Sequence, residues 1–103
     1  MPVSPSSSEK LQERTELQKK EPEKYQVVLL NDDYTTMEFV ISVLESVFQK
    51  SPAEAFQIMM LVHRQGRGIA GVYPWELAET KVETVISLAR EAGYPLKAIS
   101  ERV

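Results

Sequence analysis

The residues of this chain best suited to chemistry are a polar cluster, Asn31-Asp32-Asp33, and His63, the only histidine. A carboxylate and an imidazole can act as acid and base if the fold brings them together. Taken alone, each feature has a simpler interpretation. The Asn-Asp-Asp run is typical of a turn with local side-chain caps, and His63 is compatible with a satisfied core histidine. The residues by themselves favour these simpler interpretations.

Most classes of catalytic and metal site are excluded by what the sequence lacks. There is no cysteine and one histidine, so a metal ion would need carboxylates alone. The carboxylates Asp32, Asp33 and Glu38 do not have the spacing of a calcium loop. No G-x-S-x-G run occurs, and Gly66-Arg67-Gly68 lacks the frame of a phosphate-binding loop. We therefore expect no catalytic residue, no metal and no cofactor, and a protein that is not an enzyme.

Length and charge restrict the class of protein further. The chain has 103 residues, 43% of them hydrophobic, which is enough for one domain. The net charge is -3, and residues 25–103 hold seven basic and ten acidic side chains, which argues against nucleic acid as a partner. There is no apolar run long enough for a membrane span and no signal-peptide core, so the sequence predicts a cytoplasmic protein without a membrane partner.

A change in composition divides the chain. Residues 1–24 are rich in Ser, Pro, Glu and Lys, which predicts a flexible extension, and residues 25–103 form the predicted domain. Tyr25 to Leu30 is aliphatic and β-branched, which predicts a buried strand. Thr35 with Glu38 fits a capping box. A helix should follow and end near residues 49–50, because apolar residues recur at helical spacing: Met37, Val40, Ile41, Leu44, Val47 and Phe48.

Start and stop signals predict the remaining elements. Ser51-Pro52 should begin a second helix that runs to about Arg64 before Gly66. A short strand over residues 69–73, a third helix opening at Pro74 and ending at Gly93, and a last strand over residues 96–103 complete the order. The predicted fold is β-α-α-β-α-β, an α+β domain with three helices packed on a small antiparallel sheet.

Four ordered blocks resemble the ClpS adaptors of the bacterial Clp proteolytic machinery. They are residues 25–35, Met37-Glu38-Phe39-Val40, Val62-His63 with Gly66, and Ala78-Glu79-Thr80-Lys81. The resemblance covers residues 24–103 and implies a fold like the C-terminal domain of the ribosomal stalk protein. It also implies recognition of substrate N-terminal peptides whose first residue is Leu, Phe, Tyr or Trp, and their delivery to a Clp AAA+ ATPase.

The resemblance also implies site residues by position. Asn31, Asp32 and His63 match the residues that hold the substrate's α-amino group, and their acceptors suit the three donors of an ammonium. Met37 matches the residue that gates the side-chain pocket against β-branched first residues. The remaining pocket walls match Thr35, Val40, Val43, Met59, Val62 and Leu96.

On the third helix, Glu76 and Lys81 match positions that face the N-terminal domain of a ClpA- or ClpC-type ATPase, although a solvated helix face would look the same. Two alternatives stay open from the residues. In a generic interaction domain, the side chains of Asn31, Asp32 and His63 would point apart and no pocket would open beside them. In a small hydrolase, Asp32 and His63 would need a nucleophile or a metal within reach.

Overall fold

The computed structural model describes residues 23–103, so most of the predicted extension lies outside the described part. No helix of that part is long and apolar enough to cross a bilayer. The elements follow in the predicted order: β1 (Lys24–Leu30), α2 (Met37–Ser46), α3 (Pro52–Gln65), β2 (Arg67–Pro74), α4 (Trp75–Ala92) and β3 (Lys97–Arg102).

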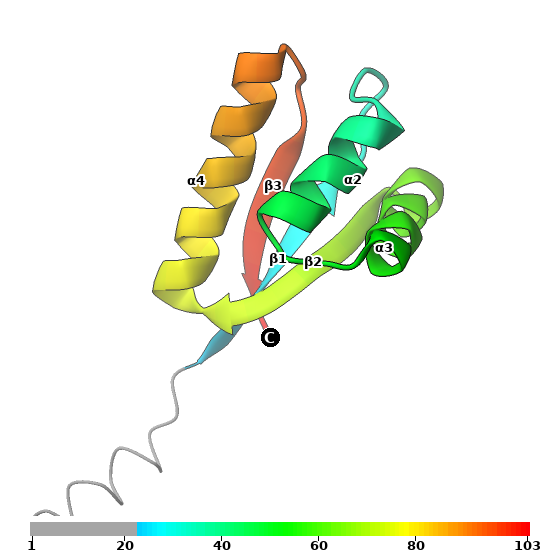
Figure 1. The fold of residues 1–103 in the computed structure, drawn as a ribbon. Coiled ribbons are helices and arrows are strands. Elements are labelled where there is room, and N and C mark those ends of the chain that lie inside the picture. Colours follow the sequence, from blue (N-terminus) through cyan, green and yellow to red (C-terminus); the bar gives the residue numbers. More distant parts are fainter. Residues whose placement is uncertain (1–22) are drawn as a thin grey trace, which may run out of the picture.

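The three strands form an antiparallel sheet with β1 in the middle, and the three helices lie on one face of it (Figure 1). Val27, Val28 and Leu29 have no exposed surface. This burial agrees with the apolar run Val27-Val28-Leu29-Leu30 in the second half of β1, because the middle strand of a sheet has a neighbour on each edge. The α+β architecture predicted from the sequence is confirmed.

The core lies between the sheet and the helices. Val27 and Leu29 point into it from β1, together with buried residues that include Val40, Val43 and Leu44 of α2, Met59 and Val62 of α3, Ala78, Val85 and Ala89 of α4, and Leu96 and Ala98. Val28 alternates to the other face, where Ile69 and Ile99 are its neighbours on the flanking strands. The helical periodicities predicted from the sequence therefore mark the sides that pack on the sheet.

The start of α2 differs from the prediction by one residue. Thr36, not Thr35, is the N-cap, and its hydroxyl accepts a hydrogen bond from the backbone N–H of Phe39 at 3.1 Å. Thr35 is held instead by Asp32. The local pattern could not separate the two threonines, because either hydroxyl can cap a helix. The helix also ends earlier, at Ser46, although Val47 and Phe48 remain buried.

The other helix ends agree with the sequence signals. Ser51 and Glu54 form a reciprocal capping box at the start of α3. Gly66 (φ 89°) and Gly93 (φ 83°) end α3 and α4 in the left-handed region, which favours glycine. Pro74 is the N-cap of α4 and still belongs to β2, which is longer than predicted. β1 begins at Lys24, the last residue assigned to the extension.

Candidate functional site

The end of β1 and the end of α3 meet at one hydrogen bond. The backbone N–H of Asn31 donates to the carbonyl of Gly66 at 3.0 Å, directly after the pairing of Leu30 with Arg67. Gly66 caps α3 only three residues after His63. The left-handed turn at Gly66 lets β2 run back along β1, and this places His63 beside the polar cluster although they are far apart in sequence.

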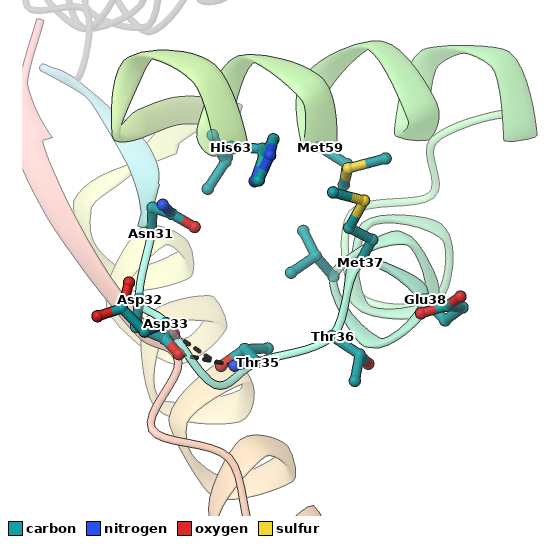
Figure 2. Close-up of a pocket in the computed structure, with 11 residues that line it drawn as sticks. Asn31, Asp32, Asp33, Thr35, Thr36, Met37, Glu38, Met59 and His63 are labelled. Atoms are coloured by element: carbon teal, nitrogen blue, oxygen red, sulfur yellow. Dashed lines mark hydrogen bonds between the residues drawn. The ribbon is translucent and has the colours of Figure 1, made fainter.

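A hollow of about 430 Å³ opens between this junction and the first turn of α2. Asn31 and His63 lie on one side of it, and Met37 and Met59, from two different helices, come together on the other (Figure 2). The volume falls within the range of ligand pockets in proteins. Its lining residues are Asn31, Asp32, Asp33, Thr35, Thr36, Met37, Glu38, Val40, Met59, Val62 and His63.

The floor of the hollow is apolar and buried, whereas Met37 at its edge is exposed. Val40, Met59 and Val62 are at most 6% exposed, whereas Met37 is 41% exposed. Val43 and Leu96 were predicted as walls, but they are buried in the core and do not line the hollow. Both belong to the buried core cluster that also contains Val40, Met59 and Val62.

Asp32 organises the loop that carries it. Its Oδ1 accepts hydrogen bonds from the backbone N–H groups of Tyr34 (2.8 Å) and Thr35 (2.7 Å), and its Oδ2 accepts one from the Thr35 hydroxyl (2.7 Å). Burial disfavours the charged carboxylate, but these three hydrogen bonds outweigh it, and the pKa of Asp32 lies below its ordinary 3.8. The turn interpretation of the Asn-Asp-Asp run is thus correct, and the same carboxylate also lines the hollow.

His63 is exposed, so the alternative of a core histidine is wrong. The generic interaction domain predicted polar side chains that point apart with no pocket beside them, and the observed hollow disagrees with it. For a hydrolase, Asp32 would have to work with His63, yet its carboxylate is bonded to Thr35. Within residues 23–103 there is also no cluster of three side chains able to hold a metal ion.

Three further residues line the hollow that the sequence did not single out for it: Asp33, Thr36 and Glu38. The only feature of the sequence that could have indicated their place in the hollow is their proximity in the chain to Asp32 and Met37. Asp33 and Glu38 add two acidic residues to the lining beside Asp32, although Figure 2 shows the Glu38 side chain directed away from the hollow. The lining, drawn from residues 23–103, includes no lysine or arginine. A cationic group is therefore favoured at its mouth over an anionic one.

Comparison with known proteins identifies the family. The family model described as ATP-dependent Clp protease adaptor protein ClpS matches residues 20–99. The chain belongs to the ClpS family. A curated ClpS adapter protein of Herminiimonas arsenicoxydans is 54% identical over 90 residues, which are 87% of this chain and 88% of that protein. A ClpS of Burkholderia mallei (strain SAVP1) is 53% identical over 89 residues, 86% of each.

A solved structure extends the comparison to three dimensions. Agrobacterium tumefaciens ClpS2 bound to L-phenylalaninamide superposes with a TM-score of 0.78 at 42% sequence identity, and it covers 81% of this chain and all of that one. The protein is thus an adaptor of the Clp protease system and not an enzyme. The resemblance derived from the four sequence blocks is confirmed.

The block Ala78-Glu79-Thr80-Lys81 of this ClpS domain is largely engaged within the fold. Ala78 is fully buried, and Glu79 accepts a hydrogen bond from Ser100 of β3 at 2.6 Å. Lys81 donates to the carbonyl of Val47 at 2.6 Å, and its ammonium lies 5.7 Å and 5.2 Å from the ring centroids of Phe48 and Tyr73. Glu76, by contrast, is exposed at the start of α4.

Proposed function

We propose that this ClpS adaptor binds the free α-amino group and the bulky hydrophobic first residue of substrate proteins. The single observation that carries the proposal is the hollow that joins acceptors to an apolar floor, with Asn31, Asp32 and His63 at one side and Met59 and Val62 beneath. The ligand of ClpS2, L-phenylalaninamide, combines the same two features, a free α-amino group and a large apolar side chain.

The polar side of the site suits an ammonium. The carboxylate of Asp32 accepts three hydrogen bonds within its own loop, which leaves lone-pair capacity on Oδ2 for one more donor. The amide oxygen of Asn31 and a neutral nitrogen of His63 take the other two donors. Each charged hydrogen bond contributes about 1.5 to 3 kcal/mol. An acetylated N-terminus loses both the charge and the donors and binds far more weakly.

The apolar side of the site suits Leu, Phe, Tyr or Trp. Burial of one such side chain contributes about 1.5 to 3 kcal/mol, and with the polar contacts and the cost of association this gives micromolar affinity, roughly -8 kcal/mol. Thr35 and Val40 flank the first side chain, and Val43 and Leu96 fix the shape behind it. Met37 stands at the entrance, where a side chain branched at Cβ would collide with it.

Delivery to a Clp AAA+ ATPase forms the second half of the proposal. Helix α4 carries the surface for the N-terminal domain of a ClpA- or ClpC-type ATPase, with Glu76 and Lys81 as contact residues and with the adaptor in the cytoplasm. Glu76 is exposed and free to meet a cationic partner group. Lys81 is partly exposed, and its ammonium donates a hydrogen bond to the carbonyl of Val47.

Fluorescence anisotropy with short labelled peptides tests recognition of the first residue. Peptides that begin with Leu, Phe, Tyr or Trp should bind, and those that begin with Ile, Arg or acetyl-Leu should not. In Asp32→Ala the binding of the Leu peptide should fall at least about tenfold, since a charged hydrogen bond is lost. Leu77→Ser, an exposed change on α4, is the control. Equal affinity for all peptides would refute the proposal.

Charge reversal tests delivery separately. Glu76→Lys should weaken binding to the isolated N-terminal domain of a ClpA-type ATPase at least about fivefold, because a rim charge pair becomes a repulsion. The same variant should bind the Leu peptide as the wild type does. Glu91→Lys reverses an exposed charge at the other end of α4 and should leave both affinities unchanged. If Glu91→Lys is as damaging as Glu76→Lys, the assigned surface is wrong.

A further inference from the structure

Tyr94 connects the turn after α4 to the first turn of α2. Its ring packs against Phe39, with centroids 4.9 Å apart and planes inclined by 48°, a favourable geometry for an aromatic pair. The backbone of Tyr94 is fixed at the same time, because its N–H donates to the carbonyl of Ala89 at 2.8 Å beside the left-handed Gly93. The backbone hydrogen bond and the ring contact together hold Tyr94 against the first turn of α2.

The same side chain reaches the helix cap. The hydroxyl of Thr36 donates to the hydroxyl of Tyr94 over a long distance of 3.5 Å, and it also accepts from the N–H of Phe39. Tyr94 thus contacts Thr36 and Phe39, the two residues that flank the stretch containing Met37. The hydrogen bond is weak at this length, so most of the support comes from the ring pair.

Met37 depends on that support. It is the first residue of α2 and 41% exposed, so packing of its own side chain restrains it little. The hydrogen bonds of Asp32 hold the loop as far as Thr35 and no further. Beyond that point, the position of Met37 beside Met59, on the same side of the hollow, is set by where the first turn of α2 lies (Figure 2).

We propose that Tyr94 is a positioning residue for substrate selectivity: by holding the first turn of α2 against the turn after α4, it fixes Met37 and so the width of the entrance. This inference rests on the proposed function of the same hollow. A loosened first turn lets the entrance widen and admits first residues branched at Cβ, because discrimination by shape fails when the wall can yield. Selectivity, more than affinity, is the property that Tyr94 controls.

The test measures selectivity as the Kd of a peptide that begins with Ile divided by the Kd of a peptide that begins with Leu. A lower ratio means weaker discrimination against Ile. In Tyr94→Leu this ratio should fall about three- to tenfold, in line with the loss of one aromatic pair. Tyr94→Phe keeps the ring and should retain most of the ratio. The matched control is Tyr73→Leu, which removes a ring from the Phe48–Tyr73 pair, where the centroids are 6.3 Å apart, at the far end of β1. It should leave the ratio unchanged.

A double-mutant cycle separates positioning from general loosening. If Tyr94 acts through Met37, then Tyr94→Leu should have no further effect on the ratio when Met37 is already changed to Ala. An additional loss of the same size in the Met37→Ala background would overturn the inference. So would an equal fall of the ratio in Tyr73→Leu, or an unchanged ratio in a folded Tyr94→Leu.

Peptide binding by the wild type distinguishes failure of the proposed function from failure of the role assigned to Tyr94. If the wild type fails to bind the Leu peptide, the proposed function itself is wrong. If it binds and discriminates while Tyr94→Leu discriminates equally well, only the role of Tyr94 is refuted. Circular dichroism reports whether Tyr94→Leu folds. Should it not fold, Phe39→Leu removes the same ring contact from the side of α2, and the same ratio decides the question.

Discussion

At the scale of single residues, Asp32 performs two tasks with one carboxylate. It accepts three hydrogen bonds that shape its loop, and it faces the hollow proposed to hold an ammonium. The two tasks are compatible, since a carboxylate has about four acceptor positions and each loop contact also favours the charged form. The residue that binds is thus preorganised by the contacts that a simple turn would make.

This double task predicts how stability depends on pH. The pKa of Asp32 is lowered from 3.8, so its charged form stabilises the folded state at pH values above 3.8, and this contribution is lost as the pH falls through the lower folded-state pKa. Asp32→Asn should therefore lower the free energy of unfolding by about 1 kcal/mol at pH 7 and by much less near pH 2.

Urea denaturation of the wild type and of Asp32→Asn at several pH values measures this difference. The exposed neighbour Asp33 provides the control, since Asp33→Asn removes the same charge one residue further on. Stability losses that are the same for both variants at every pH would show that net charge, and not the loop contacts of Asp32, is responsible.

At the scale of elements, two side chains of α4 hold this helix to the rest of the domain, and one of them, Lys81, was assigned by resemblance to a partner surface. Lys81 donates to the carbonyl of Val47, the C-cap residue of α2, while Glu79 holds Ser100 of β3. A helix C-terminus leaves carbonyl groups without partners, and a lysine is a suitable donor to them. The block that contains Lys81 therefore has a structural task whatever the ATPase requires.

Replacement of Lys81 by methionine should reveal that task. Lys81→Met keeps most of the stem but leaves the carbonyl of the buried Val47 without its donor, which should cost about 1 to 2 kcal/mol of unfolding free energy. Thermal and chemical denaturation measure the loss. The exposed Lys97 on β3 is the control, and Lys97→Met should change stability by less than about 0.5 kcal/mol. Unchanged stability in Lys81→Met would show that the contact with Val47 contributes nothing.

At the scale of the whole molecule, the site and the start of the domain lie at opposite ends of β1. Asn31 follows the last residue of the strand, whereas Lys24 begins it, and an extended strand of this length spans about 20 Å. The core is built from residues of the described part. From its composition we predict that the N-terminal extension is not needed to form the domain or the hollow.

A shortened chain tests this division. The protein comprising residues 23–103 should unfold cooperatively, with a midpoint within a few degrees of that of the full chain, and it should bind the Leu peptide equally well. Calorimetry and anisotropy provide the two measurements. A tenfold loss of peptide affinity in the shortened chain would mean that the extension reaches the site. Loss of substrate delivery alone would assign the extension to the ATPase step.

Short-range physics explains how much was predictable from the sequence. The aliphatic run over residues 27–30 of β1, the helical periodicities, the Ser51 capping box and the stops at Gly66 and Gly93 each depend on a few neighbouring residues. The elements and their order therefore followed directly from the sequence. The choice between Thr35 and Thr36 as N-cap did not follow from the sequence. It depends on the hydrogen bond that the Thr35 hydroxyl donates to Asp32, which leaves the Thr36 hydroxyl to cap the helix.

The tertiary structure alone decided which residues from distant parts of the sequence are in contact. The polar cluster meets His63 because the backbone of Asn31 is bonded to Gly66. Lys81 is directed inward to Val47, and Val43 and Leu96 are buried in the core. Tyr94 contacts a helix cap 58 residues before it in the chain. Such contacts join segments distant in the chain, and packing of the whole core selects them. The sequence by itself determined the elements and, by resemblance, the family. The resemblance also proposed most of the site residues, and only the fold brought them from separate segments into one hollow.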